Sequence, residues 1–160
     1  TYNVPNLDSM TIQKKVTGAF GERNKDFTFK VEPKDENGNP ATGVSHSTLK
    51  NGTSLKSFTL KHGESVTLYE IPIGTTITIT ETGADEYKTS ATNYDKANKK
   101  AFVYEVVNEN GNAVLKSKDN NQTVAHNAIT VTNDFAGPDP AGCGRGRRRA
   151  GGGAETQAPR

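Results

Sequence analysis

Three short segments of β type each place one reactive polar side chain among apolar residues. Lys14 lies in MTIQKKV, Glu81 ends TTITITE, and Asn133 lies in ITVTND. Side chains alternate between the two faces of a strand, so each of the three shares a face with apolar neighbours, namely Ile12 and Val16, Ile77 and Ile79, and Ile129 and Val131. We therefore expect an amine, a carboxyl group and a carboxamide to point into the interior of the fold.

These three groups could together form an amide bond between two side chains. Burial lowers the pKa of Lys14 from a reference value of about 10.4, which increases the neutral, nucleophilic form. A buried Glu81 keeps its proton, so it can hydrogen-bond the carboxamide oxygen of Asn133 and then pass a proton to the departing nitrogen. Attack of the amine on the Asn133 side-chain carbon would expel ammonia. Because the fold would hold the two groups together, the effective concentration of the amine at the carboxamide could reach about 10⁵ M or more, which would compensate for so weak an electrophile.

The same residues also allow a simpler arrangement. Lys14 could extend its amine to water at the end of the fold, with Glu81 as its partner in a partly buried ion pair. Asn133 would then be an ordinary amide at the end of a strand. Inward lysines more often reach water than react, so the residue pattern alone leaves both interpretations open.

The rest of the sequence indicates an all-β fold. Hydrophobic residues make up 31% of the chain and Trp is absent, which is typical of a thin core. Thr, Val, Ile, Phe and Tyr recur in short runs split by Gly, Asn and Asp, and no helical period persists. Neighbouring strands lie roughly 4.8 Å apart, so adjacent first and last strands could bring Lys14 and Asn133 into contact. We expect strands at residues 10–16, 27–33, 75–81, 87–93, 101–107, 112–118 and 126–135.

Two connections carry turn signals. Asn110 and Gly111 predict a hairpin between the strands that flank them. Residues 57–71 also read as a hairpin, with its turn at residues 61–64. The segment 44–56 is more polar and predicts a short edge strand plus a loop.

Composition divides the chain into three parts. Residues 1–9 are polar, contain Pro5 and predict a linker, residues 10–135 predict one β-sandwich domain, and residues 136–160 predict a disordered Gly/Arg-rich tail. The first two parts together carry 15 Lys and Arg against 16 Asp and Glu, so the net charge of +2 comes from the tail. The single cysteine, Cys143, also lies in the tail, so no disulfide is expected in the domain.

Five segments together closely resemble the isopeptide-linkage domain of Gram-positive pilins and surface adhesins, of the streptococcal major-pilin backbone type. They are MTIQKKVTG, NKDFTFKV, FTLKHGESVTLYEIPIGTTITITE, EYKTS and ITVTN, in the order that the family shows. The resemblance covers residues 10–135 and implies an immunoglobulin-like β-sandwich of the CnaB type.

In that family, the middle lysine of the opening strand, the glutamate closing the central strand and the asparagine closing the last strand form an isopeptide bond. These positions match Lys14, Glu81 and Asn133, which implies a cross-link from Lys14 to Asn133 with Glu81 as the proton shuttle. The family often has three consecutive lysines where this chain has Gln13, Lys14 and Lys15. Lys15 is therefore the alternative nucleophile, although alternation places Lys14 on the inner face.

The resemblance implies a structural stalk or shaft module of a cell-surface protein or pilus, extracellular and associated with the cell wall. Its partners would be neighbouring domains or pilin subunits. No cofactor and no catalytic turnover are implied, because the cross-link forms once per molecule. The alternative is an adhesin module that presents the polar loops around residues 34–56 and 91–100 to a host glycan or protein. No signal peptide, membrane span or LPxTG motif occurs in these residues, so we expect such parts elsewhere in the parent protein.

Other kinds of chemistry have little support. His46, His62 and His126 lack Cys or carboxylate residues at ligand spacing, so no metal site is expected. The Arg-rich cluster at 145–149 could bind nucleic acid, but a Gly-rich basic tail beside a near-neutral domain is more often solvated. Ser, His and Asp show no triad arrangement, so no hydrolase is expected. The lack of a long apolar run predicts no membrane insertion.

Overall fold

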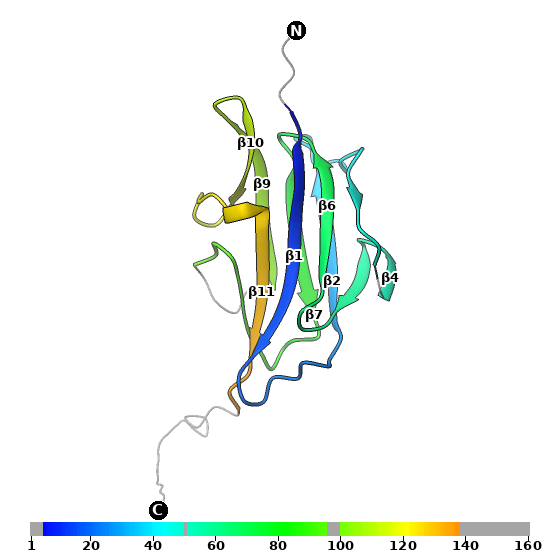
Figure 1. The fold of residues 1–160 in the computed structure, drawn as a ribbon, viewed down its shortest axis with the longest axis vertical. Helices are drawn as coiled ribbons and strands as arrows, with labels where there is room; N and C mark the ends of the chain where they lie inside the picture. The colour runs from blue at the N-terminus through cyan, green and yellow to red at the C-terminus, as the bar shows by residue number, and fades with distance from the viewer. Residues whose placement is uncertain (1–4, 50, 96–99, 138–160) are drawn as a thin grey trace, which may run out of the picture.

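The computed structural model describes residues 5–49, 51–95 and 100–137, and within them it confirms the all-β class. The strands form two sheets that face each other as a sandwich (Figure 1). The elements are β1 (Leu7–Thr17), β2 (Phe27–Lys34), β3 (Ser45–His46), β4 (Asn51–Ser54), β5 (Ser57–Leu60), β6 (Ser65–Ile71), β7 (Thr76–Thr82), β8 (Lys88–Ala91), β9 (Ala101–Glu109), β10 (Asn112–Ser117), the 3₁₀ turn η1 (Ala125–Asn127) and β11 (Ala128–Asp134).

Alternating sequence patterns produce the single core between the sheets. One sheet has five strands in the order β3-β6-β1-β11-β8, and the other has six in the order β10-β9-β7-β2-β5-β4. In β7, for example, Ile77 and Ile79 are fully buried, while the threonines that alternate with them are partly exposed. Burial of such side chains from both sheets supplies the main stabilisation of the fold. The fold is an immunoglobulin-like β-sandwich, as the sequence predicted.

The first and last strands are neighbours. β1 pairs with β11 in parallel, with Lys14 opposite Val131 and Val16 opposite Asn133. Figure 1 shows the two strands side by side along the long axis of the sandwich, both running in the same direction. β1 therefore begins at one end of the sandwich and β11 finishes at the other end. The expected pairing of the first and last strands is confirmed.

The predicted hairpin at residues 57–71 is wrong. β5 pairs with β2 and β4 in the six-stranded sheet, whereas β6 pairs with β1 and β3 in the five-stranded sheet. The turn between them crosses from one sheet to the other, and it is fastened to β1 because Gly63 N–H donates to the Lys14 carbonyl. Phe58 and Val66 both face the core, but from opposite sheets. Alternation records burial and not the pairing partner, so it could not distinguish a hairpin from a crossover.

Other boundaries follow the sequence closely. β1 begins at Leu7 and not at Met10, because Leu7 is buried and pairs with Ile71. The hairpin at Asn110 and Gly111 is confirmed, and both residues have the positive φ that such a turn requires. The polar segment 44–56, predicted as one short edge strand plus a loop, contains two short strands, β3 and β4, at the edges of different sheets. Residues 1–4 of the expected linker and 138–160 of the expected tail lie outside the described residues.

The backbone conformation of Gly18 and its close neighbours leave no room for a side chain at this position. Its φ is +94°, and a Cβ there would overlap the backbone of Phe135, with the Phe135 nitrogen 2.8 Å away. We expect Gly18→Ala to reduce the free energy of unfolding by about 2 to 3 kcal/mol, because steric overlap adds to the cost of positive φ. Gly38 also has positive φ, +82°, but a Cβ added there would have no atom within 4 Å.

Gly38→Ala is therefore the matched control and should cost only about 1 kcal/mol. Urea denaturation followed by circular dichroism measures both variants. Equal losses at the two positions would show that contact with Phe135 contributes nothing.

Candidate functional site: a buried lysine, glutamate and asparagine

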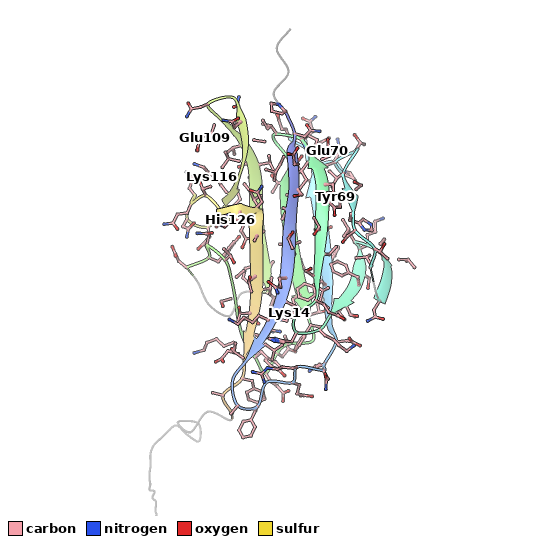
Figure 2. The ribbon with its side chains drawn as sticks, in the orientation of Figure 1. Lys14, Tyr69, Glu70, Glu109, Lys116 and His126 are labelled. Carbon is pink, nitrogen blue, oxygen red and sulfur yellow. The ribbon has the colours of Figure 1, made fainter. Side chains whose placement is uncertain are left out.

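The structure brings together the three side chains singled out in the sequence. Lys14 on β1 and Asn133 on β11 project from the five-stranded sheet, and Glu81 on β7 projects from the sheet opposite. Their exposed fractions are 0%, 0% and 1%. Lys14 lies toward the end of β1 at which that strand finishes (Figure 2). The site is therefore inside the sandwich, between its two layers.

One carboxylate oxygen contacts both of the other groups. Glu81 Oε2 lies 3.3 Å from Lys14 Nζ, and it accepts a hydrogen bond of 2.7 Å from Asn133 Nδ2. Lys14 Nζ also donates to the Val131 carbonyl at 3.3 Å. The second Glu81 oxygen, Oε1, is buried and has no hydrogen-bond partner among the described residues. An amine, an acid and a carboxamide are thus joined through a single oxygen atom.

Burial shifts the lysine and the glutamate toward their neutral forms. Loss of water lowers the pKa of Lys14 from 10.5 to about 8, although the nearby Glu81 carboxylate opposes this change. Loss of water likewise raises the pKa of Glu81, against the opposing effect of Lys14. The rings of Phe27 and Phe29, with centroids 4.8 and 5.9 Å from Lys14 Nζ, cover the amine. The faces of these rings attract a cation, but desolvation has the larger effect on the pKa of Lys14.

The interpretation in which the Lys14 amine reaches water is wrong. Both side chains of the Lys14–Glu81 pair have 0% exposure, so the amine does not extend out of the fold. The adjacent Lys15 is exposed on the outer face of β1. Of the two candidate lysines, Lys14 is the one that lies beside Glu81.

Sequence reasoning misassigned one contact and missed one residue. The Asn133 carboxamide oxygen was expected to face Glu81, but it is Nδ2 that does so. Oδ1 instead accepts a 3.0 Å hydrogen bond from the hydroxyl of Thr89, which is fully buried on β8. Thr89 alternates with the buried residues Tyr87 and Ala91, so the inward parity that identified the other three would also have identified this hydroxyl.

The arrangement supports acyl chemistry between side chains. A lysine with lowered pKa is a nucleophile, a carboxamide is an acyl group with a leaving nitrogen, and a protonated carboxyl group can transfer protons.

Within the described residues, no group of three or more His, Cys, Asp or Glu could hold a metal ion. No helix in that part of the chain is long and apolar enough to cross a membrane.

A comparison with protein families assigns the chain to one of them. The profile of a family described as a domain of unknown function, DUF7601, matches residues 8–135. The chain belongs to this family. A comparison with curated protein sequences finds no match.

Among the solved structures with a similar fold are a pilus-presented adhesin and a major pilin. A pilus-presented adhesin, Spy0125 (Cpa), has a TM-score of 0.52 and 25% identity, over 86% of this chain and 29% of that one. The major pilin T3.2 from Streptococcus pyogenes has a TM-score of 0.51 and 26% identity, over 80% of this chain and 45% of that one. This DUF7601 chain therefore has a pilin-like fold, as the sequence resemblance implied, and it spans less than half the length of these proteins.

A third structure shares the fold at lower identity. It is an adhesin from Mobiluncus mulieris, described as containing intramolecular disulfide, isopeptide and ester cross-links, with a TM-score of 0.50 and 20% identity. The match covers 82% of this chain and 42% of the adhesin. At this identity the likeness shows the fold alone.

The lowered pKa of Lys14 can be measured in a variant that cannot form the amide. In Asn133→Ala, the Lys14 amine should lose its charge as pH rises through about 8. NMR of ¹³C-labelled lysine, following the Lys14 ε-carbon shift against pH, measures this directly. A Lys14 amine that titrates at the reference value of about 10.4 would contradict the assignment of a desolvated site.

Proposed function

We propose that this domain is a structural module of a cell-surface protein or pilus, stabilised by an amide bond that it forms between Lys14 Nζ and Asn133 Cγ. The observation that carries the proposal is the contact of Glu81 Oε2 with both the amine and the carboxamide, in a site closed to water. Folding of the chain would be enough to bring these three reactive groups together, so no other protein would be needed for the reaction.

The proposed reaction exchanges one amide for another. The Lys14 nitrogen attacks Asn133 Cγ, a new C–N bond forms, and the bond from Cγ to Nδ2 breaks. One proton moves from Nζ through Glu81 to Nδ2, which leaves as ammonia. With a pKa of about 8, roughly one Lys14 amine in ten is neutral at pH 7, against about one in three thousand for an ordinary lysine. The groups are consumed once, so the domain is not an enzyme with turnover.

The topology supports a mechanical role for this bond. Tension would enter at the start of β1 and leave at the end of β11, because these strands run side by side in the same direction. The bond would pass the force from Lys14 to Asn133 and bypass the loop of about 120 residues between them. Closing a loop of this length also destabilises the unfolded state by roughly 4 to 5 kcal/mol, by analogy with a disulfide.

The comparisons support the setting of this module. The adhesin Spy0125 is pilus-presented and T3.2 is a major pilin, and both share the fold of this chain. We infer an extracellular, cell-wall-associated location, with neighbouring domains or pilin subunits as partners. Because the chain spans 29% and 45% of those proteins, this role is proposed for one module of a longer protein.

Intact mass tests the bond. The wild-type chain should be lighter than its sequence by one ammonia. Glu81→Gln and Lys14→Met should both have the full sequence mass, because the first lacks a proton shuttle and the second lacks the nucleophile. Lys15→Met is the control and should still lose ammonia, because Lys15 is exposed. Circular dichroism confirms that each variant folds, and a folded wild type at full mass would refute the proposal.

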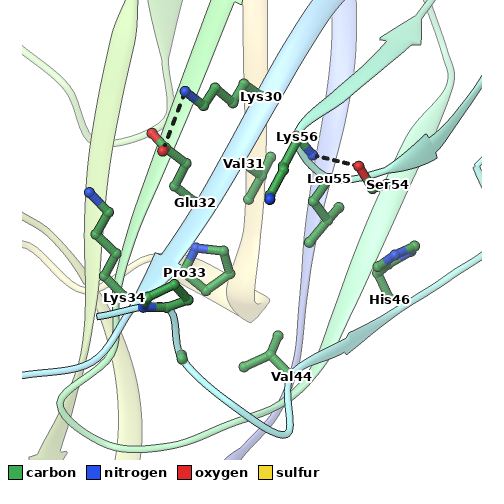
Figure 3. Close-up of a pocket in the computed structure, with 12 residues that line it drawn as sticks. Lys30, Val31, Glu32, Pro33, Lys34, Val44, His46, Ser54, Leu55 and Lys56 are labelled. Carbon is green, nitrogen blue, oxygen red and sulfur yellow. Dashed lines mark hydrogen bonds and ion pairs between the residues drawn. The ribbon is translucent and has the colours of Figure 1, made fainter. Parts of the chain in front are cut away.

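A groove on the side of the sandwich favours a second function, ligand binding. Its volume is about 620 Å³, within the range of about 300–1,000 Å³ typical of ligand sites. Figure 3 shows Val31 and Leu55 within it and the chains of Lys30, Lys34 and Lys56 around it. The groove is lined by β2 and by residues from the first of the two loop regions, 34–56, that the sequence suggested for an adhesin.

The chemistry of the groove favours an acidic peptide over a sugar. Of the described residues that line it, three are lysines and only Glu32 is acidic, and Glu32 pairs with Lys30 at 3.4 Å. The apolar lining is aliphatic, and no Phe, Tyr or Trp is present for a sugar ring to contact. An extended peptide with alternating carboxylate and aliphatic side chains fits this lining, and Ser54 of the edge strand β4 lies in the groove, so a peptide strand could add there.

A fluorescein-labelled hexapeptide of alternating Glu and Leu should bind, as measured by fluorescence anisotropy. Lys34→Glu and Lys56→Glu should each weaken binding about tenfold, which corresponds to about 1.4 kcal/mol. Lys88→Glu, an exposed change on the other sheet, is the control and should have no effect. If the peptide does not bind, or if a Gln-and-Leu peptide binds equally well, the groove is not an acidic-peptide site.

A further inference from the structure

We propose that Thr89 is a catalytic residue for amide formation, donating a hydrogen bond to the negative charge that develops on Asn133 Oδ1. This inference rests on the proposed cross-link and assigns a role that neither Lys14 nor Glu81 supplies. The Thr89 hydroxyl already donates to Oδ1 at 3.0 Å. It lies on β8 directly opposite Asn133 in the antiparallel pairing of β8 with β11.

The two ends of the Asn133 carboxamide have different partners. Nδ2 donates to Glu81 Oε2 at 2.7 Å, and Oδ1 accepts from Thr89. Glu81 comes from the opposite sheet, whereas Thr89 comes from the neighbouring strand of the same sheet. The plane of the carboxamide is thus fixed from both sides. Glu81 is positioned to pass a proton to the leaving nitrogen, and Thr89 is positioned to donate a hydrogen bond to the oxygen.

The oxygen needs a donor during the reaction. When Lys14 Nζ bonds to Cγ, the π electrons of the carbonyl move to Oδ1, which becomes an alkoxide. The Thr89 O–H strengthens its hydrogen bond to this oxygen and keeps its own proton. The electron pair then returns to re-form the carbonyl as the bond to Nδ2 breaks, and ammonia leaves with the proton relayed by Glu81.

Burial increases the effect of this hydroxyl. Thr89 is 0% exposed, so water does not supply an alternative donor. A donor fixed in place before the reaction needs no reorganisation when charge appears. Loss of one such donor in acyl-transfer sites typically slows the chemical step by about 10² to 10³-fold.

A rate measurement separates catalysis from a purely structural hydrogen bond. Unreacted chain, recovered unfolded in urea from inclusion bodies and checked to have its full sequence mass, is diluted into buffer, and ammonia loss is followed by intact mass over time. Thr89→Val, which keeps the shape but lacks the hydroxyl, should react about 10²-fold more slowly than wild type. Thr89→Ser, which keeps the hydroxyl, should react within several-fold of wild type. Folding is compared separately in a Lys14→Met background, where no bond can form.

The outcomes distinguish the two proposals. If wild type never loses ammonia, the cross-link itself is wrong. If wild type reacts and Thr89→Val reacts equally fast, the cross-link stands and the role of Thr89 is refuted. Equal slowing of the Val and Ser variants also refutes it, because the hydroxyl would then be irrelevant. Should Thr89→Val fail to fold, Thr89→Ala compared with Thr89→Ser carries the same test.

Discussion

Removal of water from the Lys14 amine is the constraint on which the site depends. A lysine in solvent is charged and unreactive toward an amide, and only a closed sandwich can hold it between Phe27, Glu81 and the backbone of Val131. The same burial raises the pKa of Glu81 and lowers that of Lys14. A conventional buried ion pair would be a weak source of stability. In the proposed reaction, the cost of desolvating two charges would instead prepare a nucleophile and an acid.

The topology determines what such a bond could accomplish. Lys14 and Asn133 lie on the first and last strands, which pair in parallel in the middle of one sheet. Glu81 reaches them from the other sheet, so the reactive groups meet only when the two layers have closed. Formation of the bond would therefore report completed folding. Once formed, it would join β1 to β11 near the end of the sandwich where both strands finish, so β1 would carry force along the long axis.

Strand alternation was sufficient to predict that Lys14, Glu81 and Asn133 face the interior, as the structure shows. Lys14, Glu81 and Asn133 each break an apolar face, and this irregularity does not depend on knowing the sheet order. The crossover between β5 and β6 could not be foreseen, because inward residues look alike whichever sheet they belong to. The orientation of the Asn133 carboxamide was also unpredictable, since it depends on Thr89, whose strand pairs with β11 through contacts distant in sequence. The local sequence pattern thus predicts whether a side chain points into the core, whereas the pairing of distant strands determines which residues it contacts.

Stretching single molecules by their two ends tests most directly whether the domain carries force through a covalent link. The account predicts that the wild-type domain does not lengthen as it is pulled, because the region between Lys14 and Asn133 is bypassed. Glu81→Gln, which keeps the fold without the bond, should unfold and extend by about 400 Å, the length of about 120 extended residues. A wild-type domain that extends by the same length would contradict the account.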